Sequence, residues 1–184
     1  MQVEFKTTVA GNDGKLCVGN TSVRVPLLNH DSAPLWKEHP LGSGIDGVAV
    51  DVTGHLPEKL FNVCTNECGL QSNYQPNVGD DCFVVGFPKG LSGQGGMPLW
   101  KRASIATEPE FDQGKQPIFL IDTATRKGMS GSPVIVRHSG IWNPSGKIAD
   151  DSIMGTIFNI IGIYSGRIED DEMGVQIGRE GLSR

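Results

Sequence analysis

The most informative stretch of the sequence is Gly128-Met129-Ser130-Gly131-Ser132-Pro133. Glycine adopts backbone angles that are closed to other residues, so Gly128 and Gly131 allow the chain to fold tightly around Ser130. In such a loop the backbone N–H groups of Gly128 and Ser130 can point together at a developing oxyanion. This arrangement favours a role for Ser130 as an activated nucleophile. The simpler interpretation is a Gly/Ser turn between two strands.

This stretch differs from the nucleophile elbow of α/β-hydrolases. That elbow requires a glycine two places after the serine and a helix after the turn. Here Ser132 occupies the glycine position, and the following Val134-Ile135-Val136 is an apolar run of β-forming residues. The sequence therefore predicts that Ser130 precedes a strand.

Length and composition limit the class of protein. A chain of 184 residues corresponds to one ordinary domain or a compact two-lobed one. Sixteen basic and 21 acidic residues give a net charge of −5, which argues against nucleic acid as a partner. No apolar stretch is long enough to span a membrane. The first residues, 1–6, alternate like a strand and do not resemble a signal peptide, so we expect a cytoplasmic protein.

The four cysteines do not form a recognisable metal site. Cys64 and Cys68 have a spacing loosely compatible with half of a zinc site, but Cys17 and Cys82 do not complete it. We expect buried or reduced thiols, with a disulfide as the alternative. The sequence predicts no metal and no cofactor.

Short segments of strand character, separated by turn residues, run through most of the chain. The 25 glycines and 11 prolines favour many turns and few long helices. Residues 54–75 are polar and irregular, as expected of a crossover between two halves. The pattern predicts an antiparallel all-β barrel or sandwich. The expected strands lie within residues 2–9, 15–28 (in two pieces), 45–52, 82–88, 99–107, 117–122, 134–136 and 153–164.

The hexapeptide around Ser130 resembles the nucleophile loop of trypsin-like serine peptidases, which reads Gly-x-Ser-Gly-Gly/Ser-Pro. Residues 45–50 (Ile-Asp-Gly-Val-Ala-Val) resemble the segment that carries the catalytic aspartate in that family. The resemblance extends from about Ser22 to the C-terminus. Further stretches similar to bacterial and phage-type members of the family are residues 34–40, 84–90, 99–105 and 161–166.

The resemblance implies a trypsin-like double β-barrel, antiparallel and of Greek-key type, with its active site between the barrels. Residues 1–60 would form the remainder of the first barrel, which we expect to be incomplete. Residues 61–77 would form the crossover, and residues 78–184 the second barrel.

The resemblance also implies a serine endopeptidase that acts on a polypeptide substrate. Ser130 would be the nucleophile, Asp46 would orient a histidine, and the N–H groups of Gly128 and Ser130 would form the oxyanion hole. Asp51 is the competing acid, although an exposed position within a strand explains it more simply. Met129 stands where trypsin carries the aspartate that pairs with a newly cleaved N-terminus, so that activation step is not expected. The residues implied in substrate binding are Ala124, Thr125, Tyr164, Ser165 and Gly166, and the uncharged Ala124 predicts a preference for small or apolar side chains.

The catalytic histidine is the main departure from the family pattern. In the family this histidine lies well upstream of the aspartate, whereas His30 and His39 lie too close to Asp46, and His55 and His138 follow it. We expect each of these four to be a solvated loop or strand-edge histidine, and the chain to begin after the histidine-bearing segment. A first barrel opened in this way would leave an unpaired sheet edge through which the chain could self-associate.

Two alternatives remain at this point. One is a peptidase-like binding module that retains the cleft without catalysis. The other is an unrelated β-sandwich in which the hexapeptide is an accidental turn.

Overall fold

The computed structural model describes residues 1–10, 16–55, 74–143, 147–169 and 176–181. The chain divides into two compact units. Unit 1 comprises Met1–Asn62 and Ser92–Pro98, and unit 2 comprises Val63–Leu91 and Leu99–Arg184. The described residues contain strands and short 3-10 turns but no α-helix, as the scarcity of helical periodicity predicts.

Unit 1 contains two separate antiparallel pairs of strands. Strand β1 (Gln2–Ala10) pairs with β2 (Leu16–Arg24), and β3 (Trp36–Glu38) pairs with β4 (Val48–Val50). The 3-10 turns of this unit are η1 (Gly42–Gly44), η2 (Thr53–His55) and η5 (Gln94–Gly96). Among the described residues these strands form two two-stranded sheets, so the first of the two predicted barrels is not confirmed. The prediction of two strand pieces within 15–28 is wrong, because β2 runs through Gly19-Asn20 without a break.

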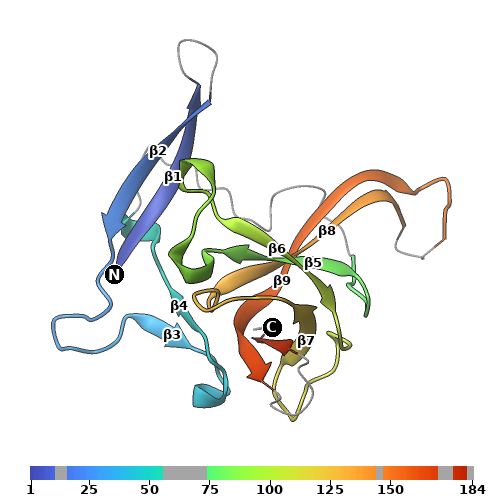
Figure 1. The fold of residues 1–184 in the computed structure, drawn as a ribbon. Helices are drawn as coiled ribbons and strands as arrows, with labels where there is room; N and C mark the ends of the chain where they lie inside the picture. Colours follow the sequence, from blue (N-terminus) through green and yellow to red (C-terminus); the bar gives the residue numbers. More distant parts are fainter. Residues whose placement is uncertain (11–15, 56–73, 144–146, 170–175, 182–184) are drawn as a thin grey trace. The chain divides into compact units, whose positions relative to one another are not determined.

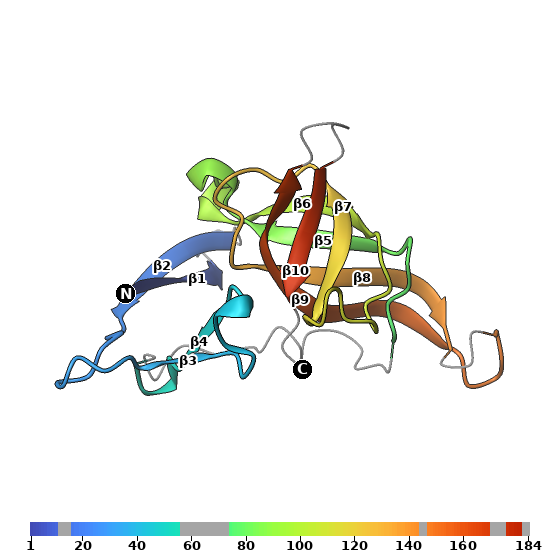
Figure 2. The same cartoon turned by 90° about the horizontal axis from the view of Figure 1, so that it is seen from below.

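Unit 2 is built from six strands that are all antiparallel to their neighbours. They pair in the closed order β10-β7-β6-β5-β8-β9, so each strand is hydrogen-bonded on both sides (Figures 1 and 2). This arrangement confirms the predicted antiparallel all-β class, and one continuous ring of strands differs from the stacked sheets of a sandwich. The strands are β5 (Asp81–Gly86), β6 (Leu99–Ile105), β7 (Ile118–Thr123), β8 (Ser132–Trp142), β9 (Ile153–Glu169) and β10 (Gln176–Gly181), with the 3-10 turn η4 (Pro88–Gly90) after β5.

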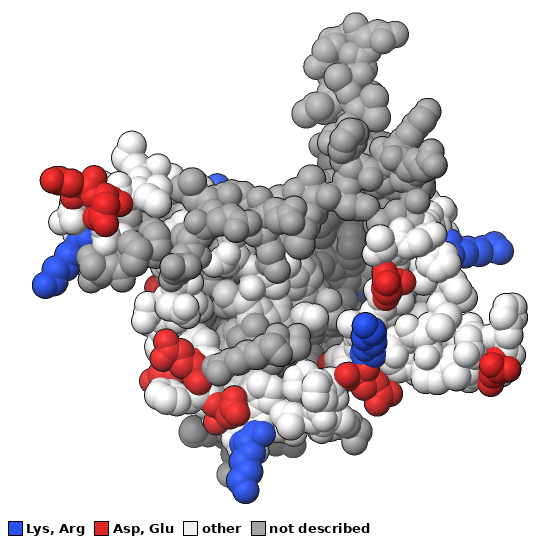
Figure 3. All heavy atoms as spheres, turned by 180° about the vertical axis from the view of Figure 1, so that it is seen from behind, with Lys and Arg blue, Asp and Glu red and all other residues white. Residues whose placement is uncertain are grey.

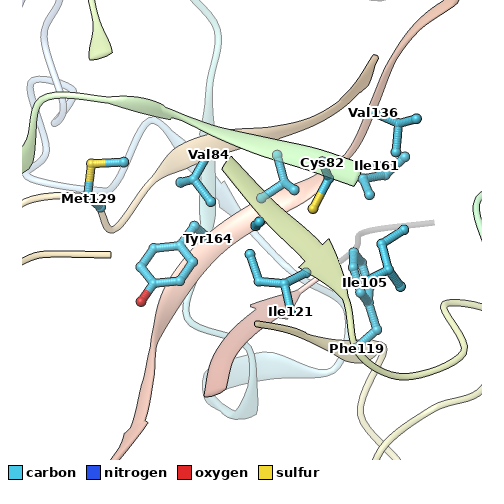
Figure 4. Close-up of a cluster of buried hydrophobic side chains, with 11 residues drawn as sticks. Cys82, Val84, Ile105, Phe119, Ile121, Met129, Val136, Ile161 and Tyr164 are labelled. Carbon is cyan, nitrogen blue, oxygen red and sulfur yellow. The ribbon is translucent and has the colours of Figure 1, made fainter. Parts of the chain in front are cut away.

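The core of unit 2 follows from the alternation of its strands. Successive side chains of a strand point to opposite faces, so every second residue faces inward. In β5 these are Cys82 and Val84, and in β7 they are Phe119 and Ile121, all of them buried. Figure 4 shows this cluster, which also contains residues of β6, β8 and β9 and Met129 of the loop before β8.

The register of β5 and β8 locates the Ser130 loop at one end of unit 2. Cys82 pairs with Val136 and Val84 with Val134, so the end of β5 lies beside the start of β8. Ser130 lies two residues before the start of β8, and β8 begins with the pair Ser132↔Tyr164. The loop therefore lies between the end of β5 and the middle of β9.

A β-bulge interrupts the pairing of β8 with β9 close to this loop. Val134 pairs with Gly162 and Ile135 with Ile160, which leaves Ile161 as an extra residue in β9. An extra residue shifts the alternation by one position. After the bulge Tyr164 is 2% exposed while Ile163 is 44% exposed, so Tyr164 faces inward.

Phe119→Ala tests the packing of this core. Phe119 is 1% exposed, and its truncation should lower the free energy of unfolding by about 3–5 kcal/mol because it leaves a cavity. Ile148→Ala is the control, since Ile148 is 83% exposed and its loss should change that free energy by less than about 0.5 kcal/mol. Urea unfolding followed by far-UV circular dichroism measures both, and equal effects of the two substitutions would contradict the assigned core.

Candidate active site

The two glycines of the Ser130 loop have the backbone conformation that the sequence predicts. The φ angle is +88° at Gly128 and +83° at Gly131. Side chains with a Cβ are strained in this region of backbone space. The predicted tight folding of the chain around Ser130 is therefore confirmed.

The loop is packed closely against the turn that follows β5. The Lys89 N–H donates a hydrogen bond to the Lys127 carbonyl over 2.7 Å. A Cβ at Gly128 would lie 3.1 Å from the Lys89 nitrogen and 3.2 Å from the Phe87 oxygen, so only a glycine fits without a backbone shift. At the end of β5, a Cβ at Gly86 would collide with Ser132 Oγ. Two close approaches, one on each side of Ser130, thus hold the loop in place.

Met129 and Ser130 point in opposite directions. Met129 is fully buried within the core of unit 2, whereas Ser130 is exposed. The Ser130 hydroxyl donates to the Ser165 carbonyl over 3.0 Å. The Gly131 N–H donates to the Tyr164 carbonyl over 2.8 Å. The buried methionine anchors the loop, and the serine hydroxyl is presented to solvent beside β9.

The backbone donors of the loop are divided into two groups. The N–H groups of Gly131 and Ser132 are used internally, the second in a turn to the Met129 carbonyl. Within the described residues, the N–H groups of Gly128 and Ser130 have no acceptor, and the same holds for Met129. The two donors predicted for the oxyanion hole are thus available to a ligand.

The predicted substrate-binding residues fall into two groups. Ala124 is exposed, while Ser165 and Gly166 are half-buried in β9, where Gly166 pairs with Arg179 of β10. The side chains of Thr125 and Tyr164 are 1% and 2% exposed. Their hydroxyl groups share a hydrogen bond of 2.6 Å. These two side chains therefore face the core of unit 2.

The two candidate acids have different local surroundings. Asp51 Oδ1 accepts a hydrogen bond from the Thr53 N–H over 2.9 Å at the start of η2, and hydrogen bonds from Thr53 lower the pKa of Asp51. This turn explains Asp51 without catalysis. Asp46 lies exposed between η1 and β4, and its carboxylate has no hydrogen-bond or ion-pair partner within the described residues. Asp46 belongs to unit 1 and Ser130 to unit 2, so their meeting in one site stays a prediction.

Three of the four histidines belong to unit 1 and one to unit 2. His30 and His55 are exposed, as predicted, and His39 Nδ1 accepts a hydrogen bond from the Leu41 N–H over 3.2 Å. His138 lies in β8, six residues beyond Ser132, which corresponds to about 20 Å along a strand. His138 is therefore too far along β8 to act on Ser130.

His138 is part of a polar cluster that the sequence analysis did not identify. It is half-buried in β8, and its ring stacks on Tyr74 with centroids 5.7 Å apart. The Tyr74 hydroxyl donates to Asp80 Oδ2 over 2.5 Å. Burial and this hydrogen bond raise the pKa of Tyr74 above its usual range. Tyr74 and Asp80 lie in the irregular stretch before β5, and His138 is distant from both in the sequence. No sequence signal therefore indicates the cluster.

The charged side chains of the described residues show no strong clustering on the face examined. On the face shown in Figure 3, acidic and basic side chains of the described residues are dispersed and neither sign forms a continuous patch.

Cys82 is fully buried and Cys17 lies in β2, while Cys64 and Cys68 fall outside the described residues. In the described part of the chain, no three His, Cys, Asp or Glu side chains are grouped as metal ligands. No described helix has the length and apolar character needed to cross a membrane.

Comparison of the chain with protein-family models, with curated proteins and with solved structures found no match. The functional interpretation therefore depends on the residues and geometry of the Ser130 loop.

A pair of glycine substitutions tests this geometry. Gly131→Ala adds a Cβ at positive φ with no atom within 4 Å, so it should cost about 1–2 kcal/mol of unfolding free energy from backbone strain alone. Gly128→Ala adds the same strain and also presses on the backbone of Phe87 and Lys89, which should cost roughly 1–3 kcal/mol more. Chemical unfolding of the two variants gives the comparison, and a Gly131→Ala variant less stable than Gly128→Ala would contradict the close approach.

Proposed function

We propose that the chain is a serine endopeptidase domain of the trypsin-like type, with Ser130 as its nucleophile and a polypeptide as its substrate. In this proposal the two units correspond to the two barrels of that fold. Asp46 of unit 1 is the acid that orients the catalytic imidazole.

The reaction proposed is acyl transfer through an acyl-enzyme. Ser130 Oγ attacks the peptide carbonyl carbon while an imidazole accepts the hydroxyl proton. The carbonyl oxygen becomes an oxyanion, which the N–H groups of Gly128 and Ser130 stabilise. The imidazolium then gives its proton to the leaving amine, and water hydrolyses the acyl-serine in a second round of the same steps.

One observation carries this proposal: Ser130 is exposed between two left-handed glycines, next to a buried Met129 and beside N–H groups that have no acceptor among the described residues. A turn without a catalytic role does not need this combination of features. A turn serves equally well with its N–H groups bonded or its apolar side chain exposed, so their combination favours a nucleophile loop.

The proposed mechanism requires a histidine whose imidazole can reach Ser130. The distance of His138 from the loop leaves His30, His39 and His55 of unit 1 as the candidates within this chain. Because His138 cannot serve as the base, a second candidate function is also favoured. This is a peptidase-like module that binds peptides without cleaving them. A serine hydroxyl without a base is a weak nucleophile, so the two functions differ in reactivity.

Labelling with a fluorophosphonate probe tests the proposal, with and without added imidazole. If Ser130 lies in a prepared site that lacks only its base, free imidazole should raise the labelling rate at least about tenfold, below the roughly 10²–10⁴-fold of a positioned base. Ser130→Ala should abolish labelling, and Ser139→Ala, an exposed serine in β8, is the matched control. Asp46→Asn should reduce the imidazole effect, whereas Asp51→Asn should leave it unchanged.

Each outcome of this experiment has a defined meaning. Rapid labelling without imidazole also supports the nucleophile, and loss of that labelling in one of the His30→Ala, His39→Ala or His55→Ala variants identifies the base. Labelling that does not depend on Ser130, or no labelling under any of these conditions, contradicts a peptidase and leaves the binding module.

We further propose that the chain self-associates through sheet edges of unit 1. Among the described strands, β3 and β4 pair only with each other, and strand edges of this kind recruit other chains. Val48→Lys places a charge on β4 and should lower the average mass in light scattering at a given concentration. Val78→Lys, which is also exposed (49%, against 58% for Val48) but lies outside the strands, should not change that mass. A monodisperse monomer at all concentrations would contradict this proposal.

A further inference from the structure

Strand β8 extends well beyond the strand that pairs with it on one side. Strand β5 pairs with β8 only from Val134 to Val136, whereas β8 continues to Trp142 and pairs along this length with β9 alone. Figures 1 and 2 show the hairpin of β8 and β9 projecting from the ring of strands. Among the described residues, no backbone hydrogen bond reaches the other edge of residues 137–142. This edge can therefore accept a further strand.

The chain before β5 turns away from this edge. The Gly79 N–H donates to the Ile105 carbonyl over 2.8 Å, and the Ile105 N–H donates to the Asp80 carbonyl over 3.0 Å. These residues therefore follow the end of β6 and not β8. The space beside β8 is a polar cavity of about 490 Å³, lined on one side by residues 137–139 and on the other by residues 79–81.

A second, smaller cavity lies farther along β8. Its volume is about 220 Å³, and Ile141 and Ile148 contribute apolar side chains to it. The stacked rings of Tyr74 and His138 border both cavities, so the two adjoin. A ligand that lies along the edge of β8 thus meets a polar site first and an apolar site next to it.

Two arginines line the polar cavity, and their partners differ. Arg102 forms a bidentate ion pair with Asp81, with distances of 2.9 and 2.7 Å. Asp80 accepts a hydrogen bond from the Tyr74 hydroxyl. Arg137 is exposed and has no hydrogen-bond or ion-pair partner in the described part of the chain. Because this guanidinium is available, the cavity favours a ligand with an acidic group.

We propose that the edge of β8 from Arg137 to Trp142 binds an extended polypeptide segment as an added strand. Backbone hydrogen bonds would supply the affinity, and the two cavities would supply the selectivity. Both neighbours of β8 are antiparallel to it, and a segment paired in the same way runs from Ile141 toward Arg137. Its apolar residue then comes first, and its acidic residue follows about four positions later.

This site is separate from the Ser130 loop and does not rest on the proposed function. The free edge is short and ends where β5 begins, so it suits a segment of a few residues that ends or bends there. A second copy of the chain is the other possible occupant, and the experiment below distinguishes it from a peptide.

Fluorescence anisotropy tests the inference with the rhodamine-labelled, C-terminally amidated peptide Ser-Thr-Leu-Thr-Val-Thr-Glu-Ser. The chain carries Ser130→Ala, so that cleavage cannot affect the result. Saturable binding is expected with a Kd below about 1 mM. The reversed peptide Ser-Glu-Thr-Val-Thr-Leu-Thr-Ser has the same composition and should bind at least about fivefold more weakly, because its leucine and glutamate face the wrong cavities.

N-methylation of the peptide separates edge pairing from side-chain contacts. In an antiparallel pair, alternate residues direct their N–H groups toward the partner strand. Methyl groups on one alternate set of backbone nitrogens should therefore abolish binding, whereas methyl groups on the other set should change it by less than about threefold. Equal effects of the two sets would contradict an added strand.

Substitutions in the protein locate the site. Arg137→Glu should weaken binding at least about tenfold, and exchanging the glutamate of the peptide for lysine should restore it. Lys37→Glu is the control, with the same change of charge at an exposed residue that lines neither cavity. Ile141→Asp should weaken binding at least about threefold, unlike Met154→Asp at the exposed residue opposite it in β9. All four positions are exposed or in the rim of a cavity, and far-UV circular dichroism verifies that each variant is folded.

The outcomes bear on this inference and not on the proposed peptidase, because the measurement is binding by a chain without the serine hydroxyl. Absence of saturable binding, equal binding of the reversed peptide, or unchanged binding in both Arg137→Glu and Ile141→Asp would overturn it. A lower average mass of these two variants in light scattering, without binding of the peptide, would assign the edge to a second copy of the chain and would also overturn it.

Discussion

The close approach between Gly128 and the backbone of Phe87 and Lys89 is the constraint on which the geometry of the candidate site depends. The hydrogen bond from the Lys89 N–H to the Lys127 carbonyl holds the two segments together. The positive φ of Gly128, a residue without a Cβ, allows their backbones to come this close. From there the chain can place Met129 in the core and turn Ser130 outward. Packing against the turn after β5 thus determines the direction of the serine, and the chemistry proposed for Ser130 follows from that direction.

The sequence predicts much of unit 2 because its strands alternate clearly. Residues 82–88 and 99–107 alternate or contain β-branched and aromatic side chains, and both predicted segments contain observed strands, β5 and β6. Strand β10 was not predicted, since its residues Gln-Ile-Gly-Arg-Glu-Gly offer one apolar side chain and two glycines. Its place depends on backbone hydrogen bonds to β9, the preceding strand, and to β7, which is distant in sequence, and such bonds leave no periodic pattern of side chains.

The candidate site could be predicted where its residues are contiguous. The glycines, Ser130 and the N–H groups that have no acceptor in the described part of the chain all belong to one short loop. The contact between Tyr164 and Thr125 joins residues 39 positions apart and has no such signal. Strict alternation from the buried Ile157 would also place Ile163 inward and Tyr164 outward, and the bulge at Ile161 reverses this. The resemblance implies a role in substrate binding for Tyr164, whereas the structure places its ring in the core.

The pairing of β10 has a consequence for how the protein is made. This strand is the last of the barrel in chain order, and it bonds to β7 on one side and to β9 on the other. Translation proceeds at roughly 5–20 residues per second, so the ring of strands stays open until β10 has left the ribosome. During that interval β7 and β9 expose backbone donors and acceptors that can bind other nascent chains. Synthesis of the chain, and not the finished fold, is then the stage at which the edges of β7 and β9 that β10 covers are unpaired.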